Sequence, residues 1–122
     1  MKVLTAIIRP GRLSAVLAAL DRANFSRVTV TQALGRGSEP ALSGFYRGTR
    51  VELRFRERLR LEIVLADAQV DRAVAAIRTA AATNTPGDGN IWIQPVADFV
   101  RIRDGARGGD ALMPAGLPET IP

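Results

Sequence analysis

Apolar and polar residues alternate along the chain in short patterns that predict strands and helices. A mostly apolar run from Val3 to Ile8 ends at Arg9-Pro10-Gly11, as expected for a buried strand followed by a chain-breaking turn. Apolar residues then recur every three or four positions from Arg12 to Ala23, which predicts an amphipathic helix. From Val28 to Ala33 they alternate with polar residues, which predicts a half-buried strand.

A long segment without periodicity follows this strand. Residues Gly35 to Gly48 are rich in glycine, serine and proline, so we expect a loop there. Loops longer than about 12 residues are usually functional or disordered, which makes this one a candidate partner-binding segment. Alternation resumes over Val51–Arg56 and Leu59–Ile63, and we predict strand segments there, on both sides of Glu57-Arg58.

Helical spacing of apolar residues returns between Ala68 and Ala82 and predicts a second helix. The turn-forming sequence Gly87-Asp88-Gly89 then leads into a predicted strand from Ile91 to Val96. Residues 113–122 carry several prolines and no periodicity, so we expect a poorly ordered tail. The sequence therefore predicts one folded domain over residues 1–112.

The order strand, helix, strand, long loop, strand, helix, strand predicts an α+β fold. It is the ferredoxin-like βαββαβ pattern with an antiparallel sheet. Two helices can cover only one face of such a sheet, yet the strand at 3–8 and the one ending near Leu65 carry apolar residues on both faces. Burial of the second face requires further copies of the chain, so the pattern predicts an oligomer.

Composition narrows the possible chemistry. The chain has 122 residues, of which 47% are hydrophobic, enough for one modest core. It contains no cysteine and no histidine, which excludes disulfides, the usual zinc sites and catalysis by a Ser-His-Asp triad. The apolar start is interrupted at Arg9-Pro10, too early for a signal peptide or a membrane span, so we expect a cytoplasmic protein.

The net charge of +5 favours anionic partners such as nucleotides, nucleic acid or lipid headgroups. All but one of the 17 basic residues are arginine, a bias that a GC-rich genome also produces. Four of these arginines, at positions 54, 56, 58 and 60, alternate along one predicted strand face. A nucleic-acid surface would need interleaved exposed aromatic residues, and only Phe55 is near, on the opposite face. We therefore expect a charged outer face that does not bind nucleic acid.

Two short segments are candidate anion sites. The glycines of Gly87-Asp88-Gly89 could turn backbone N–H groups toward phosphate oxygens, or they could form an ordinary tight turn. Arg101 and Arg103 are two positions apart, so in an extended segment both guanidinium groups would leave the same face and could clamp a polyphosphate. A solvated strand face would show the same spacing, so both interpretations remain open.

Several motifs resemble landmarks of the PII signal-transduction family. They are Arg9-Pro10 after Ala6-Ile7-Ile8, Thr29-Val30-Thr31, Tyr46-Arg47-Gly48, Glu62-Ile63-Val64, Thr83 with Gly87-Asp88-Gly89, and Arg101-Ile102-Arg103-Asp104-Gly105. The resemblance runs from residue 1 to about residue 112. It implies a non-enzymatic, homotrimeric regulator of nitrogen metabolism that binds ADP, AMP or ATP between subunits. It also implies a flexible T-loop over residues 35–55 that regulates a target protein, such as a membrane transporter or a metabolic enzyme.

The resemblance also implies which residues bind the nucleotide. Matching positions are Ile7, Thr29, Gly35, Arg36, Gly37, Ser38, Arg58, Glu62, Ile63, Val64, Gly87, Asp88, Gly89, Asn90, Arg101 and Arg103. Ile7, Thr29, Glu62 and Val64 would line the adenine and ribose, and the glycine turn would cradle phosphates, with both arginines reaching in from the neighbouring subunit. The residues expected to contact the target are Glu39, Tyr46, Arg47, Arg50 and Val51.

Departures from the family pattern change the expected ligands. Asn90 stands where members usually have lysine, and Ser38 where they usually have arginine, so two cationic phosphate ligands are missing. A hydrogen bond to a charged group contributes about 1.5–3 kcal/mol, and its loss falls hardest on the most anionic ligand. We therefore expect ADP or AMP to bind at least as well as ATP.

Three further departures concern the T-loop and its base. Glu39 replaces a glutamine, and Arg58 replaces a lysine that pairs with 2-oxoglutarate. Glu39 could ligate Mg²⁺ but would repel a dicarboxylate, so we expect weak or absent 2-oxoglutarate sensing. Val51 occupies the position of a tyrosine that many members carry and that is uridylylated, so we expect no such modification there.

Two alternatives of a different class remain. One is a weak nucleotide hydrolase that uses Glu39 or Glu62, and the other is a trimeric structural or nucleic-acid-binding protein.

Overall fold

The computed structural model describes residues 1–37, 42–53 and 55–112, and for 42–46 and 49–53 it describes the backbone alone. The elements follow in the order β1 (Lys2–Ile8), the 3-10 helix η1 (Pro10–Arg12), α1 (Leu13–Arg22), β2 (Thr29–Gly35), β3 (Leu42–Tyr46), β4 (Thr49–Leu53), β5 (Arg56–Leu65), the 3-10 helix η2 (Asp67–Gln69), α2 (Val70–Ala81), β6 (Asn90–Pro95) and α3 (Gly109–Leu112). None of the helices in these ranges is long and apolar enough to cross a membrane.

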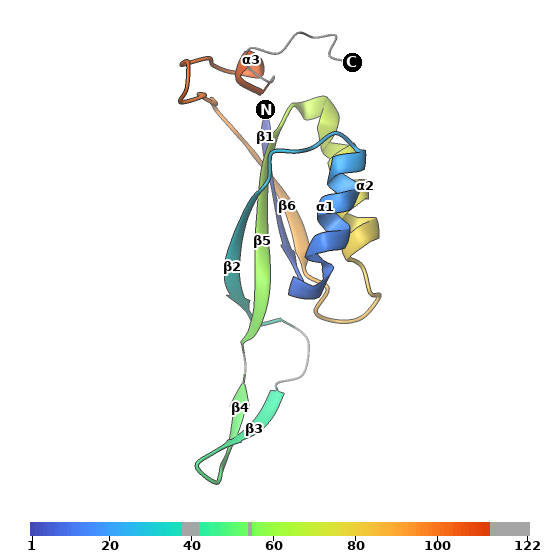
Figure 1. The fold of residues 1–122 in the computed structure, drawn as a ribbon, viewed down its shortest axis with the longest axis vertical. Helices are drawn as coiled ribbons and strands as arrows, with labels where there is room; N and C mark the ends of the chain where they lie inside the picture. The colour runs from blue at the N-terminus through green and yellow to red at the C-terminus, as the bar shows by residue number, and fades with distance from the viewer. Residues whose placement is uncertain (38–41, 54, 113–122) are drawn as a thin grey trace.

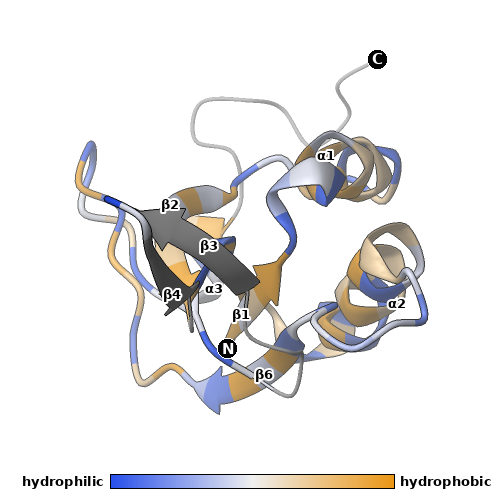
Figure 2. Cartoon of the chain, turned by 90° about the horizontal axis from the view of Figure 1, so that it is seen from below, coloured by the Kyte–Doolittle hydropathy of each residue, from blue (hydrophilic) through white to orange (hydrophobic). Residues whose placement is uncertain are grey.

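Four strands form one antiparallel sheet in the order β2-β5-β1-β6. Helices α1 and α2 lie side by side on one face of it (Figures 1 and 2). This arrangement confirms the predicted ferredoxin-like α+β fold. Residues 113–122, predicted to be a poorly ordered tail, lie outside the described residues.

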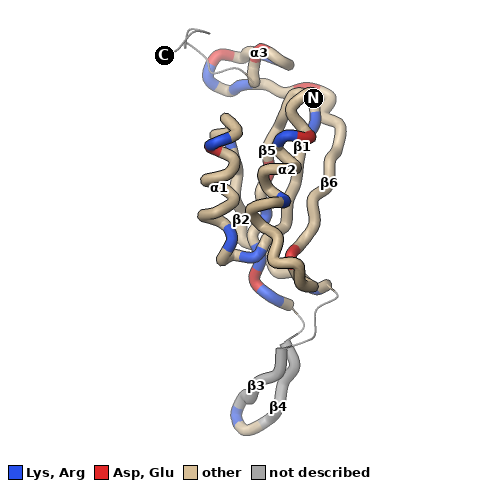
Figure 3. Tube along the Cα trace, turned by 90° about the vertical axis from the view of Figure 1, so that its right-hand side faces the viewer, with Lys and Arg blue, Asp and Glu red and all other residues tan. Residues whose placement is uncertain are grey.

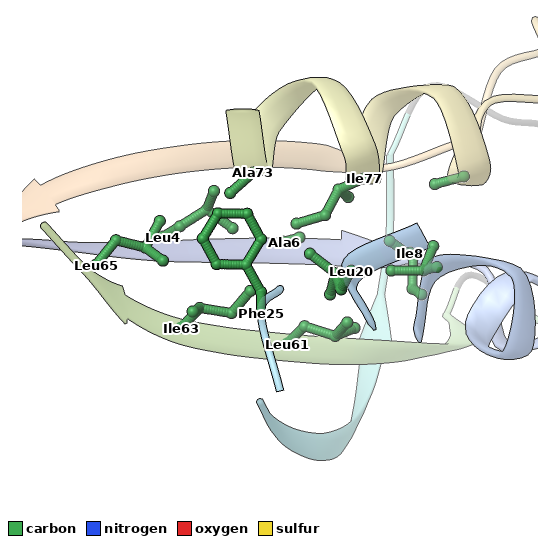
Figure 4. Close-up of a cluster of buried hydrophobic side chains, with 12 residues drawn as sticks. Leu4, Ala6, Ile8, Leu20, Phe25, Leu61, Ile63, Leu65, Ala73 and Ile77 are labelled. Carbon is green, nitrogen blue, oxygen red and sulfur yellow. The ribbon is translucent and has the colours of Figure 1, made fainter. Parts of the chain in front are cut away.

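The core lies between the sheet and the two helices (Figure 4). Leu4, Ala6 and Ile8 of β1 point toward the helices because alternate residues of a strand share a face. Neighbouring β5 contributes its own alternate residues, and α1 and α2 contribute theirs at helical spacing. The remaining buried members of the core are Val16, Leu20, Phe25, Leu61, Ile63, Leu65, Ala73, Ile77 and Ala81. Full burial of each large side chain stabilises the fold by about 1.5–3 kcal/mol.

The second face of the sheet carries polar and aromatic residues and is covered by no helix of the described chain. Arg60 Nε lies 3.0 Å from Glu62 Oε1, and the Arg60 guanidinium lies 5.9 Å from the centroid of the Trp92 ring. The strand register sets Thr5 between Glu62 and Trp92, and Thr5 is buried. Trp92 is exposed on this face and Val64 is half-buried there, as expected for a chain that packs against copies of itself.

The expected loop over 35–48 is partly wrong, because the segment contains a β-hairpin. Strands β3 and β4 pair from Leu42↔Leu53 to Tyr46↔Thr49. Arg47 and Gly48 connect them with φ of 52° and 80°, the two positive values that a type I′ turn requires. The glycine at the second position allows this tight reversal. Cross-strand pairing stabilises the two strands, although the sequence of this segment shows no strand periodicity.

The predicted break at Glu57-Arg58 is also wrong. β4 ends at Leu53, and β5 runs without interruption from Arg56 to Leu65. Pairing with β2 explains this continuity, since Leu34 lies opposite Glu57 and Ala33 opposite Arg58. Arg58 is only 8% exposed, so the expected solvated arginine face does not extend to it, and Arg54 lies outside the described residues.

Candidate functional site

The loop between α2 and β6 is organised around the carboxylate of Asp88. The backbone N–H groups of Thr83 and Asn84 donate to its Oδ2 over 2.7 and 2.9 Å, and the Thr83 hydroxyl donates to its Oδ1. These hydrogen bonds hold the pKa of Asp88 well below its usual range, and the bond from the Thr83 hydroxyl has the largest effect. Asp88 therefore stabilises its own loop, and its predicted contact with a nucleotide stays a prediction.

Arg9, at the end of β1, ties this loop to the sheet. Its Nε donates to Asp88 Oδ1 over 3.2 Å, and its Nη2 donates to Thr85 Oγ1 over 3.2 Å and to the Pro86 carbonyl over 2.7 Å. A planar guanidinium makes these contacts from two nitrogens in a fixed geometry, whereas a lysine would have to make all three from a single atom. Sequence reasoning found the Arg9-Pro10 motif but missed this function, because the partners lie more than 70 residues further along the chain.

Gly89 fixes how closely the loop approaches β1. Its φ is +100°, and a Cβ atom there would lie 1.7 Å from the Ile7 carbonyl oxygen. Only glycine fits this contact. The turn at 87–89 therefore passes directly over the end of β1.

The structure brings one group of predicted residues around a cavity of about 310 Å³, which we call the hairpin-end cavity because it lies at the end of the sheet nearest β3 and β4. Gly35 and Arg58 both line this cavity and lie against each other. A Cβ atom on Gly35 would be 3.3 Å from Arg58 Cγ. Predicted residues that line it are Ile7, Gly35, Arg36, Gly37, Arg58, Gly87, Asp88, Gly89 and Asn90.

A second group lines a cavity of about 560 Å³ at the opposite end of the sheet, which we call the terminus-end cavity. The predicted residues here are Thr29, Glu62, Ile63 and Val64. Arg27 and Phe99 also line it, and sequence reasoning missed both. Arg58 and Val64 are six residues apart on β5, which corresponds to about 20 Å along a strand. One chain therefore does not bring the two groups to a single ligand.

Arg101 and Arg103 lie in a tight reversal rather than in the extended segment that we expected. The C-terminal hairpin, residues 98–108, is closed by a bridge between Val100 and Arg107, and the Arg101 N–H donates to the Ala106 carbonyl over 2.9 Å. Residues 102–104 form the turn, and Gly105 has a φ of +73°. The extended conformation predicted for this segment is therefore wrong, and the binding of phosphate by the two arginines stays a prediction.

Charged pairs hold the C-terminal hairpin together, near the N-terminus of the chain (Figure 3). Arg101 and Asp104 form a two-point ion pair, and Arg107 Nη1 lies 2.5 Å from Asp98 Oδ2. Hydrogen bonding to Arg101 is the main cause that lowers the pKa of Asp104 to about 2, and the same contact raises the pKa of Arg101. Arg27 and Arg101 both donate to the Ala111 carbonyl, over 3.1 and 3.4 Å, which docks α3 beside the terminus-end cavity.

Several predicted residues cannot be placed in either cavity. Ser38 and Glu39 lie outside the described residues, as do the side chains of Tyr46, Arg50 and Val51. Arg47 is exposed at the turn between β3 and β4. In the described ranges, His, Cys, Asp and Glu side chains form no group of three or more that could hold a metal ion. The possible Mg²⁺ ligand Glu39 thus stays a prediction.

The chain matches the family model described as Nitrogen regulatory protein P-II over residues 1–106. Over 112 residues, which are 92% of this chain and 100% of the relative, it is 41% identical to the Nitrogen regulatory protein P-II of Azospirillum brasilense. With the same coverage of both chains, it is 40% identical to proteins of that name from Rhodospirillum rubrum and Mesorhizobium japonicum. The resemblance found in the sequence motifs is confirmed: the chain belongs to the nitrogen regulatory protein P-II family.

Proposed function

We propose that this chain is a homotrimeric, cytoplasmic signalling protein that binds ADP, AMP or ATP between subunits and regulates a target protein through residues 35–55. The observation that carries this proposal is the division of the predicted nucleotide-binding residues between two cavities at opposite ends of one sheet. Two incomplete sites on one chain become complete when the hairpin-end cavity of one copy meets the terminus-end cavity of the next.

Cyclic symmetry is the assembly that completes every site. A contact between two different surfaces generates a closed ring when its rotation closes, and each subunit then gives one half-site and receives the other. The sheet face without helices supplies the apolar area for such a ring, with Trp92 exposed and Val3, Ile7 and Val64 half-buried in the single chain. In this assembly the domain over residues 1–112 forms the ring, and the C-terminal hairpin brings Arg101 and Arg103 to the neighbour's nucleotide.

The chemistry of the two cavities fits the two ends of a nucleotide. The hairpin-end cavity offers the glycine turn at 87–89 with Arg36 and Arg58, a set suited to phosphate. The terminus-end cavity offers Thr29 and Val64 beside aromatic rings, a set suited to a base. Because Asn90 adds no cation at the phosphate end, ADP and AMP are expected to bind at least as tightly as ATP.

Mixed trimers test the division of the site between subunits. The variant Asn90→Asp places a carboxylate in the hairpin-end cavity, and the double variant Arg101→Ala, Arg103→Ala removes the cations that the neighbour supplies. Each is expected to bind ADP poorly alone. When the two are co-expressed with different tags and purified as mixed trimers, one cleft combines two intact halves, so calorimetry should recover about one tight ADP site per trimer.

A site contained within one subunit would give no recovery in mixed trimers, and a monomeric protein would form none. Either result would refute the proposal. Phosphate release from ATP would instead favour the hydrolase alternative, although the Glu62 carboxylate, 3.0 Å from Arg60, is already paired and therefore a poor general base. Thermal stability that no nucleotide raises would favour the structural or nucleic-acid-binding alternative.

A further inference from the structure

The ion pair between Arg101 and Asp104 is bidentate. Arg101 Nε donates to Asp104 Oδ1 over 2.9 Å, and Arg101 Nη2 donates to Oδ2 over 2.8 Å. Two parallel hydrogen bonds between a guanidinium and a carboxylate are stronger and more directional than a single contact. The Arg101 side chain is 16% exposed and that of Asp104 is 42% exposed, so the acid faces solvent more than the base does.

The turn holds both partners of this pair in place. The Ala106 N–H donates to Asp104 Oδ1 over 3.1 Å, and the Gly105 N–H donates to the Arg101 carbonyl over 2.8 Å. On its other side, Arg101 Nη1 donates to the Ala111 carbonyl over 3.4 Å. Since the pKa of Asp104 is lowered to about 2, its carboxylate stays charged throughout the physiological pH range.

We infer that Asp104 is a specificity-determining residue of the proposed nucleotide site, because its carboxylate occupies the edge of Arg101 that a phosphate would otherwise take. This inference rests on the proposed function, in which Arg101 contacts the neighbour's nucleotide. A phosphate must then either displace Asp104 or approach the guanidinium beside a second negative charge.

The physical consequence depends on the charge of the ligand. When Arg101 holds a phosphate beside the Asp104 carboxylate, the repulsion between the two anions grows with the number of phosphate charges nearby. ATP therefore loses more affinity than ADP, and ADP loses more than AMP. This selection against highly charged nucleotides acts through the C-terminal hairpin, which belongs to a different subunit of the cleft from the one that contributes Asn90.

The experiment compares two single substitutions that change the net charge equally. Asp104→Asn removes the carboxylate paired with Arg101, and Asp98→Asn removes the one paired with Arg107 on the same hairpin. Affinities for AMP, ADP and ATP are measured by calorimetry on the intact oligomer. For Asp104→Asn we expect ATP to bind about fivefold more tightly and AMP less than about twofold more tightly. For Asp98→Asn we expect changes below about twofold for all three.

A double-mutant cycle then tests whether Asp104 changes nucleotide affinity through Arg101. In the Arg101→Ala background, Asp104→Asn should leave the ratio of ATP to AMP affinity unchanged, because no guanidinium remains for the two acids to share. An equal gain in ATP affinity with and without Arg101 would overturn the inference, since Asp104 would then act only as a distant charge. An equal gain from Asp98→Asn would overturn it for the same reason.

The outcomes also separate this inference from the proposed function. If Arg101→Ala weakens nucleotide binding while Asp104→Asn changes nothing, only the role of Asp104 is refuted. If Arg101→Ala leaves the affinity for every nucleotide unchanged, both the role of Asp104 and the placement of Arg101 in the site are refuted.

Discussion

The two ends of the sheet use the same kind of ion pair for different purposes. At the hairpin end, Asp88 pairs with Arg9, and both side chains hold the loop that would carry phosphate. At the terminus end, Asp104 pairs with Arg101, a side chain that the proposed function assigns to the ligand itself. On the proposed function, the comparison predicts that an acid beside an arginine supports ligand binding at the hairpin end and opposes it at the terminus end, where the arginine is itself a ligand contact.

The largest expected effect comes from changing the backbone at the hairpin end. Gly89→Ala would place a methyl group 1.7 Å from the Ile7 carbonyl oxygen and would strain a φ of +100°. We expect a loss of more than about 3 kcal/mol in the free energy of unfolding, measured by urea denaturation. The control is Gly11→Ala, where a Cβ would meet nothing within 4 Å. Equal stability of the two variants would show that the loop does not lie against β1.

Removal of the Arg9 anchor tests whether the hairpin end depends on its ion pair for ligand binding. Arg9→Gln loses the ion pair with Asp88 and most of the hydrogen bonds that Arg9 donates to Thr85 and Pro86. We therefore expect ADP affinity to fall about tenfold. Arg9→Lys keeps the positive charge but lacks the planar guanidinium. Its ADP affinity should lie between that of Arg9→Gln and that of the parent protein. Calorimetry gives the affinities, and circular dichroism checks the fold. Unchanged ADP binding by folded Arg9→Gln would mean that the loop is rigid without this anchor.

Addition of a cation at the hairpin end is expected to give a moderate gain. Asn90→Lys would place an ammonium group at the edge of the hairpin-end cavity. ATP affinity should rise about fivefold and AMP affinity by less, because the added charge acts on the more distal phosphates. Combined with Asp104→Asn, the two gains should multiply, since the substitutions lie in different halves of the site. A loss of ATP affinity in Asn90→Lys would contradict the phosphate assignment of this cavity.

The smallest expected effect is the acid dependence of stability. Asp104 has its pKa lowered from 3.8 to about 2, so its ion pair stabilises the folded state fully above pH 5, and this contribution is lost as pH falls toward 2. The pKa of Asp88 is lowered further. Urea denaturation between pH 2.5 and 7 should therefore show a weaker acid dependence in Asp88→Asn than in Asp104→Asn. The reverse order would mean that folding lowers the pKa of Asp104 more than that of Asp88.

Much of the fold was predictable from sequence because local periodicity and burial agree. β1, α1 and α2 each place apolar residues on the face that meets the core, and the structure confirms all three. The strand break at Glu57-Arg58 was wrongly predicted because two adjacent charged residues interrupt the apolar pattern. Pairing with β2 keeps both residues in strand β5. The hairpin of β3 and β4 was missed because its order comes from cross-strand pairing within a segment rich in turn-forming residues.

The candidate site was less predictable, because it depends on contacts between distant segments. Sequence motifs and resemblance named Gly89 and Thr29, but nothing in the local pattern shows that they lie in different cavities. The spacing of Arg101 and Arg103 favoured an extended clamp. Gly105 and the Asp104 pair produce a turn there instead, and sequence spacing does not distinguish the two conformations.

The pairing of Gly35 with Arg56 has a mechanical consequence. These residues end β2 and begin β5, and the chain that leaves them carries the hairpin that projects beyond the sheet (Figure 1). Gly35 also lines the hairpin-end cavity, so the point where the projecting hairpin leaves the sheet forms part of a wall around any ligand. Five residues of β3 span about 17 Å, so a tilt of a few degrees at this point would sweep the tip of the hairpin through more than an ångström.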